Sequence, residues 1–511
     1  MGFIRYITFF YDVFEQCELY LDREKHSANI LSPDSYYIPL DFEDHRYFFQ
    51  YSDYGQEQIF SLYVRYFYPG VFAEMHKQPA RFDKETSHQG LKSVEMNTKR
   101  NKYNVYLAKK IVREFLPLIR KVMISKKKVQ IGIAGSFFSR ENFSVLVKKS
   151  KAKIFPLEWT IQLDCEGETI LWDERKLLAE SGVDFDKFDK FFFSAIPYCF
   201  PKVFIELFKE TEKLHSSCLK RYSSLNYIVS EAWINDTFLS IFLALAQERG
   251  IKHINNEHNC FFHPYVGSFV LHELAMSDIF VTLGWFSHHL QGLVKGASLF
   301  EFSLNKNVGK KYEILYISAP SAPKLPHLSA AWGWECENAP KQFEFVKIFF
   351  DSLSVKVKEK ITYRKYPKAF LPGPMYYDKE YILCEQISTI KGFANTDEQS
   401  KIQMRQSNLT VIDYISTSYI EALVMNIPMI FFWNADAYYF NDENADFFKP
   451  LVDAKICQTD PIEAAHFIES IVDNPEKWWF SDETQKGKDE FLDKNLGQPE
   501  IMINYLLSLL N

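Results

Sequence analysis

The sequence predicts an α/β protein with two doubly wound, Rossmann-type domains. Short apolar strands alternate with helical segments in two separate series, the first from residue 129 and the second from residue 312. Strands that alternate with helices in this way are typical of parallel sheets with helices on both faces. The length of 511 residues also exceeds what one ordinary hydrophobic core contains, so two or more domains are expected.

The residues before the first series form a predicted extension of the first domain. The first 95 residues are aromatic and irregular in pattern, while apolar side chains recur at helical spacing over residues 97–124. Within the first series, Asp236 and Gly250 are suited to begin and to end one helix. The predicted strands of this series are 129–135, 151–159, 226–231, 251–258 and 279–285, and its predicted helices are 200–219 and 236–250.

A connector over residues 286–311 separates the two series. The second series has predicted strands at 312–318, 360–367, 409–412 and 428–433, helices at 341–359 and from residue 416, and a helical region at 461–511. Two Rossmann-type halves joined by a short connector indicate a GT-B-like architecture, in which the strand ends of both halves face a central cleft. The predicted domains are an irregular or helical N-terminal extension at 1–125, a first Rossmann-like domain at 126–300, a second at 301–490 and a terminal helix at 491–511.

Composition and charge narrow the function classes. The formal net charge of −7 argues against the basic surface of a nucleic-acid-binding protein. Two basic stretches, at 120–128 and 148–153, either form a solvated face or meet anionic lipid or an acidic glycan. The eight cysteines include no CxxC pair, the N-terminus lacks a small-residue cleavage site, and no apolar run of about 18 residues occurs. We therefore expect a cytoplasmic enzyme, with peripheral contact at the inner membrane face left open.

Residues 409–434 are predicted to form a strand, a helix and a strand, with polar side chains at the first junction. Ser416 and Thr417 stand where the helix begins, so their hydroxyl groups and the nearby backbone N–H groups are suited to bind phosphate. Glu421, one helical turn further, is placed to bind ribose hydroxyl groups, and a solvated helix residue is the alternative. The pattern predicts a nucleotide-sugar site in the second domain, with the nucleotide sugar as co-substrate and no cofactor.

Arg364 and Tyr366 follow a predicted strand in the same half of the chain. A guanidinium at a strand end can bind phosphate oxygens in two directions, and a surface salt bridge is the alternative. Asp184-Phe185-Asp186 has the Asp-x-Asp form of a metal-binding motif, but its surroundings predict the capped start of an amphipathic helix. Helix dipoles and arginine can neutralise a leaving phosphate instead, so we predict no metal requirement.

Glu257 and His258 follow a strand of the first domain and are the predicted catalytic residues. A histidine oriented by a carboxylate is a suitable general base for an acceptor hydroxyl group. Glu257 can orient His258, or can itself be the base or the nucleophile if the reaction retains configuration. The predicted acceptor or loop residues are His263, Tyr265, His272 and Glu273. For all of these residues, ordinary roles in turns and caps stay open.

Several blocks of the chain resemble a family of bacterial transferases from surface-carbohydrate loci. The blocks are Glu257-His258, Tyr265, His272-Glu273, Ser277-Asp278 and Gly284-Trp285, then Arg364 with Tyr366-Pro367, then Ser416-Thr417 with Glu421, Asn426, Pro428 and Phe432-Trp433-Asn434, and finally Trp478-Trp479. The resemblance covers residues 225–495 approximately and departs from the family pattern at Asn259 and Cys260, where glycines are usual. The third block is also similar to capsule-polysaccharide synthesis proteins that transfer Kdo from CMP-Kdo.

The resemblance implies a glycosyltransferase of bacterial surface-polysaccharide biosynthesis. Its donor would be a nucleotide-activated sugar, with CMP-linked Kdo or nonulosonate among the candidates, and its acceptor a surface glycan or a lipid-linked sugar. Two alternatives stay open. A CDP-polyol phosphotransferase can use the same scaffold, and the missing loop glycines also fit a non-catalytic, glycan-binding relative of the transferases.

Overall fold

The computed structural model describes residues 10–11, 13–19, 21, 28–45, 48–49, 53–70, 72–75, 126–135, 139–161, 163, 169–180, 186–231, 236–257, 273–286, 290–296, 308–318, 338–366, 383–415, 417–434 and 446–510. The chain divides into two compact units. The first comprises Met1–Gly135, Ala152–His253 and Pro372–Pro374, and the second comprises Ser136–Lys151, Ile254–Leu371 and Met375–Asn511. Among the described helices, none combines the length and the apolar character that a bilayer span requires.

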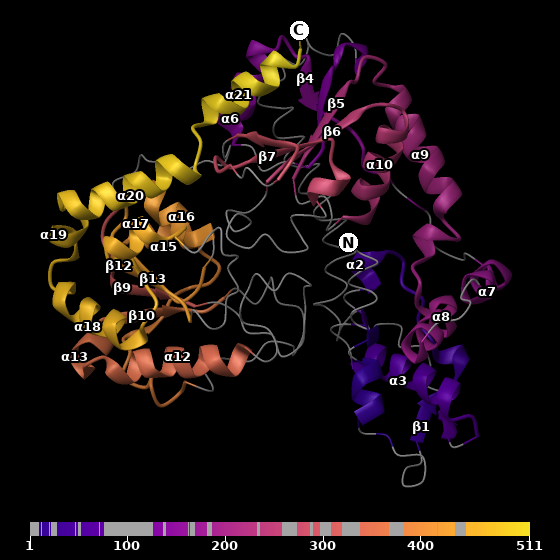
Figure 1. Ribbon diagram of the computed structural model, residues 1–511, viewed down its shortest axis with the longest axis horizontal. Coiled ribbons are helices and arrows are strands. Elements are labelled where there is room, and N and C mark those ends of the chain that lie inside the picture. The colour runs from indigo at the N-terminus through magenta and orange to yellow at the C-terminus, as the bar shows by residue number, and fades with distance from the viewer. Residues whose placement is uncertain are drawn as a thin grey trace. The chain divides into compact units, whose positions relative to one another are not determined.

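Two six-stranded sheets form the framework of the described structure (Figure 1). The first sheet has the order β4-β3-β5-β6-β7-β8, with β3 (Ile131–Ile133), β4 (Ile154–Pro156), β5 (Tyr227–Ser230), β6 (Lys252–Asn256), β7 (Ile279–Thr282) and β8 (Leu293–Lys295). The second has the order β11-β10-β9-β12-β13-β14, with β9 (Tyr312–Ile317), β10 (Ile361–Arg364), β11 (Gly392–Phe393), β12 (Ser407–Ile412), β13 (Met429–Phe432) and β14 (Cys457–Gln458). These sheets confirm the predicted α/β class with two Rossmann-type parallel sheets.

The strand order of the second sheet is that of the Rossmann fold. Its strand pairs are parallel, and β9 lies at the centre with β10 on one side and β12 on the other. Numbered within this half, the order is 3-2-1-4-5-6, and the order reverses between β9 and β12. Open α/β sheets bind ligands beyond the carboxyl ends of the strands at such a reversal, so the sheet itself marks a place for a site.

Helices cover both faces of the second sheet (Figure 1). Helices α12 (Asn338–Ser352), α13 (Val355–Lys358) and α18 (Pro461–Ile471) contribute to the core on one face, where Phe349 and Phe350 pack against Tyr316. The opposite face carries α15 (Ser400–Arg405), α16 (Thr417–Val424), α17 (Lys449–Asp453), α19 (Pro475–Trp479) and α20 (Asp482–Asn495). Alternate residues of β9 and β12 therefore enter two different cores, as a strand with two buried faces requires.

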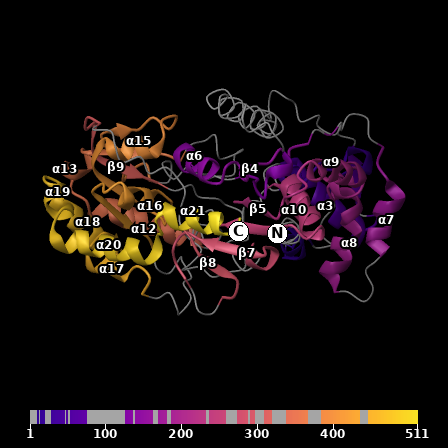
Figure 2. The same ribbon diagram turned by 90° about the horizontal axis from the view of Figure 1, so that it is seen from above.

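The last helix of the chain returns to an early helix of the same unit. Helix α21 (Pro499–Ser508) packs against α6 (Arg140–Lys149), and Figures 1 and 2 both show these helices side by side. Helix α6 has Ser139 as its N-cap, whose hydroxyl group accepts a hydrogen bond from Asn142 N at 3.1 Å. The C-terminal helix α21 thus packs against a helix that comes before the second sheet in the sequence.

The first unit contains an aromatic core that the sequence left unassigned. In this unit β1 (Ala28–Leu31) pairs in parallel with β2 (Phe72–Met75). The unit also contains the helices α2 (Phe42–His45), α3 (Asp53–Phe67), α7 (Trp172–Glu180), α8 (Lys187–Cys199), α9 (Phe208–Lys220) and α10 (Thr237–Glu248). Short 3-10 helices lie at Pro33–Ser35, Lys126–Lys128 and Lys202–Phe204. Aromatic side chains of α3 and α8 pack together, with Tyr63 and Phe191 in edge contact. The first 95 residues, expected to be irregular, thus contain the helices α2 and α3, while the helix predicted at 97–124 lies outside the described residues.

The other predicted elements are mostly present, and their ends differ for local reasons. Asp236 caps α10 by accepting a hydrogen bond from Leu239 N at 3.0 Å, and Gly250 ends it with φ +78°, as predicted. The helix predicted at 341–359 is two helices, because α12 ends at Ser352 and α13 restarts at Val355. The predicted domain boundaries remain predictions, and each of the ranges 126–300 and 301–490 contains one of the large sheets.

Candidate functional site

A buried carboxylate lies where the strand order of the second sheet reverses. Asp413 follows β12 directly and is fully buried. Its Oδ2 accepts hydrogen bonds from Tyr316 Oη at 2.9 Å and from Ser318 Oγ at 3.0 Å, both at the end of the neighbouring strand β9. Burial and the Asp413 carboxylate raise the pKa of Tyr316 well above its usual value, so this hydroxyl group stays protonated and keeps donating.

Helix α12 joins this carboxylate to the end of the next strand. Gln342 is buried in the first turns of α12, and its Nε2 donates to Asp413 O at 3.2 Å. Its Oε1 accepts from Asn434 N at 3.3 Å, just beyond β13. Asn434 Nδ2 in turn donates to Lys341 O at 3.3 Å. The ends of β9, β12 and β13 and the start of α12 are thus held in one hydrogen-bonded cluster, which we call the switch-point cluster (Tyr316, Ser318, Gln342, Asp413 and Asn434).

Helix α16 begins four residues after the buried carboxylate, as the sequence predicts. Thr417 is the first residue of the helix and is exposed, while Ser416 lies outside the described residues. Tyr419 fixes the helix to the sheet by stacking on Phe431 with ring centroids 4.7 Å apart. The N-terminus of a helix offers unpaired N–H groups and a positive partial charge, so this end of α16 is suited to an anionic group.

Glu421 lies on the second turn of α16 and is half-buried. Burial raises the pKa of Glu421, and the Lys401 ammonium group on α15 opposes this shift. A half-buried carboxylate keeps one side available to a ligand hydroxyl group while being less hydrated than a surface residue. These observations agree with a ribose contact at Glu421, which remains a prediction.

Arg364 is buried in the protein and already holds several internal acceptors. Its Nη1 donates to Asn395 O at 2.9 Å and to Gln403 Oε1 at 2.6 Å, and its Nη2 donates to Glu398 O at 2.9 Å. Only 4% of the residue surface is exposed, so Arg364 organises the segment after β11 in addition to any contact with phosphate. The predicted phosphate contact of Arg364 is not tested by these bonds. Tyr366 is half-buried, and burial raises its pKa.

Glu257 is fully buried at the end of β6 in the first sheet. Its Oε2 accepts hydrogen bonds from Leu283 N at 2.8 Å and from Trp285 Nε1 at 2.6 Å. Strand β7 stops at Thr282, short of the predicted 285, because the backbone N–H group of Leu283 turns toward Glu257 instead of toward a neighbouring strand. Thr282 Oγ1 closes the turn by donating to Trp285 O at 2.6 Å.

The other predicted residues of this region divide into described and undescribed positions. Glu273 is buried, and its Oε2 accepts a hydrogen bond from Asn255 Nδ2 of β6 at 3.3 Å. His258, His263, Tyr265 and His272 lie outside the described residues. The structure thus gives Glu257 and Glu273 anchoring contacts to the ends of β6 and β7, and catalysis by Glu257 and His258 remains a prediction.

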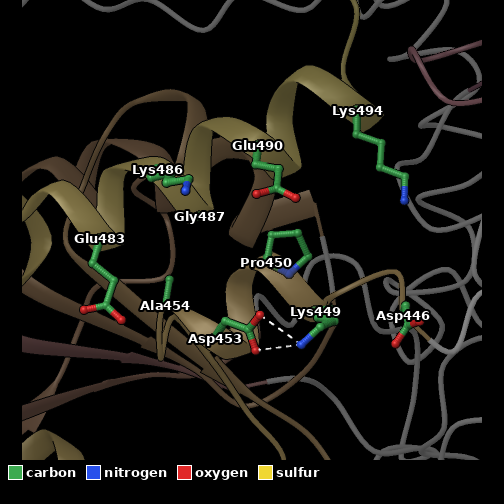
Figure 3. A pocket seen from close by; sticks show the side chains of 10 residues that line it. All are labelled: Asp446, Lys449, Pro450, Asp453, Ala454, Glu483, Lys486, Gly487, Glu490 and Lys494. Carbon is green, nitrogen blue, oxygen red and sulfur yellow. Dashed lines mark hydrogen bonds and ion pairs between the residues drawn. The ribbon is translucent and has the colours of Figure 1, made fainter.

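The described pocket lies elsewhere on the second unit. It has a volume of about 350 Å³ and lies between α17 and α20 (Figure 3), and none of the predicted site residues lines it. Charges of both signs surround it, and Lys449 Nζ pairs with Asp453 Oδ2 at 3.0 Å. Gly487 allows the close approach of the two helices, since a Cβ there would lie 2.5 Å from Pro450 O. We assign this pocket no role in the candidate site.

Asp186, in the Asp-x-Asp sequence, has a structural role. It caps α8 by accepting a hydrogen bond from Asp189 N at 2.9 Å, which agrees with the predicted helix start, while Asp184 and Phe185 lie outside the described residues. Within the part of the chain that the structure describes, no group of three or more His, Cys, Asp or Glu side chains is arranged to hold a metal ion.

Sequence reasoning missed most of the switch-point cluster. Tyr316, Ser318, Gln342 and Asp413 were not among the predicted site residues. One signal was available: Ser318 and Asp413 are the first polar residues after two apolar strands, and such positions share the carboxyl edge of a parallel sheet. Nothing in the sequence pointed to Gln342, which lies 71 residues from the Asp413 carbonyl that it binds.

The fold is similar to solved structures of low sequence identity. MurG of Acinetobacter baumannii matches 75% of this chain and 98% of its own at 9% identity and a TM-score of 0.36. A UDP-glucosyltransferase from Polygonum tinctorium gives the same coverage at 10% identity and a TM-score of 0.38, and Medicago truncatula UGT71G1 in complex with UDP-glucose gives it at 10% and 0.36.

Sequence comparison identifies the family. No curated protein matches the chain. The model of the LIC12162 family of transferases matches residues 3–510, which is nearly the whole length. The match includes both large sheets and every candidate site residue. This chain therefore belongs to the LIC12162 family of transferases.

Proposed function

We propose that this transferase is a glycosyltransferase that takes its sugar from a nucleotide-activated donor. One observation carries the proposal: the switch-point cluster of a Rossmann-ordered sheet lies directly before the start of α16 and its half-buried Glu421. This arrangement offers N–H groups and hydroxyl groups for phosphate and a carboxylate for ribose. Donor binding is assigned to Ser416, Thr417 and Glu421. Arg364 and Tyr366, at the carboxyl end of strand β10 of the same sheet, are assigned to the donor site as well.

The proposed acceptor is a surface glycan or a lipid-linked sugar, bound near the end of β6. His258 is assigned as the general base that removes the proton of the acceptor hydroxyl group while the bond between sugar and nucleotide breaks. The proposed donors include CMP-linked Kdo and CMP-linked nonulosonates. We further propose a cytoplasmic location with peripheral contact at the membrane, and a reaction in which protein dipoles replace a metal ion.

A panel of activated donors tests the proposed reaction. We expect the purified chain to release free nucleotide from one nucleotide sugar and to transfer the sugar to a lipid-linked glycan acceptor. His258→Ala is expected to lower kcat by about 10²–10⁴-fold, the usual contribution of a general base. His466→Ala is the matched control, because His466 is exposed on α18 and has no assigned role.

Two results of the panel would contradict the glycosyltransferase proposal. Release of CMP from a CDP-polyol, with phosphate appearing in the acceptor, would identify a phosphotransferase. Tight binding of the glycan without turnover of any donor would identify a binding protein. Mass spectrometry of the acceptor separates these outcomes, since a transferred sugar and a transferred polyol phosphate differ in mass and in phosphorus content.

Nucleotide affinity tests the role of Glu421. Glu421→Gln is expected to raise the Kd of the nucleotide about 10-fold, because hydrogen bonds to a charged carboxylate contribute about 1.5–3 kcal/mol and a neutral amide recovers part of this. Since burial raises the pKa of Glu421, the affinity of the wild type for the nucleotide is expected to weaken as the pH falls toward that raised pKa. The affinity of Glu421→Gln is expected not to change over the same pH range. Calorimetric titration measures both, with the exposed Glu463→Gln of α18 as control. An unchanged Kd in Glu421→Gln would remove Glu421 from the donor site.

A further inference from the structure

The turn after β7 is held from two directions. Glu257 Oε2 accepts hydrogen bonds from Leu283 N at 2.8 Å and from Trp285 Nε1 at 2.6 Å. From the other side, Gly497 N donates to Leu283 O at 2.7 Å. The single residue Leu283 therefore gives its N–H group to Glu257 and its carbonyl group to the C-terminal segment. Leu283 therefore connects the C-terminal segment to the groups that bind Glu257.

The fit between the turn and the C-terminal segment is close. Gly284 forms an antiparallel bridge with Leu496 and has φ +144°, which side chains with a Cβ rarely adopt. A Cβ at position 284 would lie 2.1 Å from Gly497 N and 2.6 Å from the Leu496 carbonyl carbon. Glycine at position 284 is thus required both by the backbone conformation and by the contact with Leu496 and Gly497.

The helix that leads into this segment also contacts the donor side of the same unit. Lys488, on α20, is buried, and its Nζ donates to Asn426 Oδ1 at 3.0 Å in the turn that follows α16. Helix α20 ends at Asn495, immediately before Leu496. Helix α16 carries Thr417 and Glu421. Helix α20 therefore links the turn after α16 to the turn that binds Glu257.

We propose that Glu257 is a positioning residue, and that the C-terminal segment Leu496–Gly497 shares this role by holding the turn Leu283–Trp285. The inference deepens the proposed function and rests on it for its catalytic readout. Glu257 is fully buried and its Oε2 receives two N–H donors. A carboxylate in that setting is suited to fix the end of β6, next to the proposed base His258, and not to take a proton from a substrate.

Conservative replacement separates positioning from chemistry. Glu257→Gln keeps an oxygen that accepts from Leu283 N and Trp285 Nε1, whereas Glu257→Leu keeps the approximate volume and loses both bonds. We expect Glu257→Leu to lower kcat at least 10-fold with little change in the KM of the donor, and Glu257→Gln to recover kcat to within a few-fold of wild type. The pH profile of kcat/KM in Glu257→Gln is expected to keep the wild-type pKa values. A Gln variant as inactive as the Leu variant would overturn the proposal and make Glu257 a catalytic residue.

Replacement of Gly497 tests the share of the C-terminal segment. Gly497→Pro removes the N–H group that binds Leu283 O, and Leu496 already has the extended backbone, φ −127° and ψ 116°, that a residue before proline needs. Gly497→Ala keeps that N–H group and is the matched control. We expect Gly497→Pro to lower kcat about 5–10-fold and to shift the Trp285 indole N–H resonance in spectra of ¹⁵N-tryptophan-labelled protein. In Gly497→Ala this resonance is expected to stay at its wild-type position.

The spectroscopic measurement does not depend on the reaction. If wild type transfers no sugar, the proposed function fails, and the Trp285 resonance still reports whether Leu496–Gly497 holds the turn. A Trp285 resonance unmoved by Gly497→Pro would overturn the role of the C-terminal segment whether or not the enzyme is active. If Gly497→Pro moves the resonance while kcat is unchanged, the turn does not position the reaction, and the proposal is overturned in its catalytic part.

Discussion

Trp479→Ala is expected to lower the free energy of unfolding by about 3–5 kcal/mol, the usual cost of removing a large aromatic side chain from a packed core. Trp479 is fully buried in the core between the second sheet and α20. Its Nε1 donates to Asn426 Oδ1 at 2.9 Å, and the same oxygen accepts from Gln485 and Lys488. Asn426 has φ +53° in the turn after α16, so Trp479 supports a strained turn in addition to filling space.

The neighbouring residue Phe480 and a conservative replacement of Trp479 give two comparisons for this prediction. Phe480 is 54% exposed, so Phe480→Ala is expected to change the free energy of unfolding by about 0.5 kcal/mol or less. Trp479→Phe removes the indole N–H group and keeps most of the ring, and about 1–2 kcal/mol of loss is expected for the hydrogen bond. Urea denaturation followed by circular dichroism measures all three variants. Equal losses in Trp479→Ala and Phe480→Ala would contradict the assignment of Trp479 to the core.

Acid is expected to destabilise the first unit between about pH 6.5 and pH 3, because two buried histidines have lower pKa values in the folded state than in the unfolded chain. Burial lowers the pKa of His45 to about 3 and that of His215 to about 4, from a usual value of 6.5. His45 packs against Phe49 and His215 against Phe242, so both rings lie in aromatic surroundings. As the pH falls, each imidazole ring therefore becomes protonated in the unfolded chain at a higher pH than in the folded chain.

The sign of the effect follows from proton binding. Below about pH 6.5 the unfolded chain binds protons at these rings and the folded chain does not, so stability falls as the pH falls and levels off near the folded pKa values. Each histidine contributes a slope of up to about 1.4 kcal/mol per pH unit, and His215 alone is expected to account for about 3 kcal/mol by pH 4.

Variants isolate the contribution of the two histidines from that of the carboxyl groups. His45→Gln and His215→Gln are expected to reduce the slope of unfolding free energy against pH, whatever their effect on absolute stability. His466→Gln, at an exposed position of α18, serves as the control and is expected to leave the slope unchanged. Chemical denaturation at a series of pH values gives the slopes. If wild type and His215→Gln show the same slope over this range, the buried neutral ring is not the cause.

Local features of the fold could be predicted from the sequence because they depend on neighbouring residues. The run of apolar and β-branched residues in β12, the cap at Asp236 and the glycine at position 250 each act within a few residues. For the same reason the start of α16 after a strand was predictable, and with it the placement of Thr417 and Glu421. The helix predicted at 341–359 is interrupted between Ser352 and Val355, and no glycine or proline in that range marks the interruption.

The sequence by itself determined two series of parallel α/β units and a helix start suited to phosphate, because apolar periodicity and capping are read over a few residues. Only the tertiary structure decided the strand order, since the order depends on how crossovers return to the sheet. That order brings Ser318 to Asp413 at a separation of 95 residues. The tertiary structure also decided that Glu257 binds the turn after β7 and that Gly284 contacts Gly497, because such contacts depend on packing between distant segments.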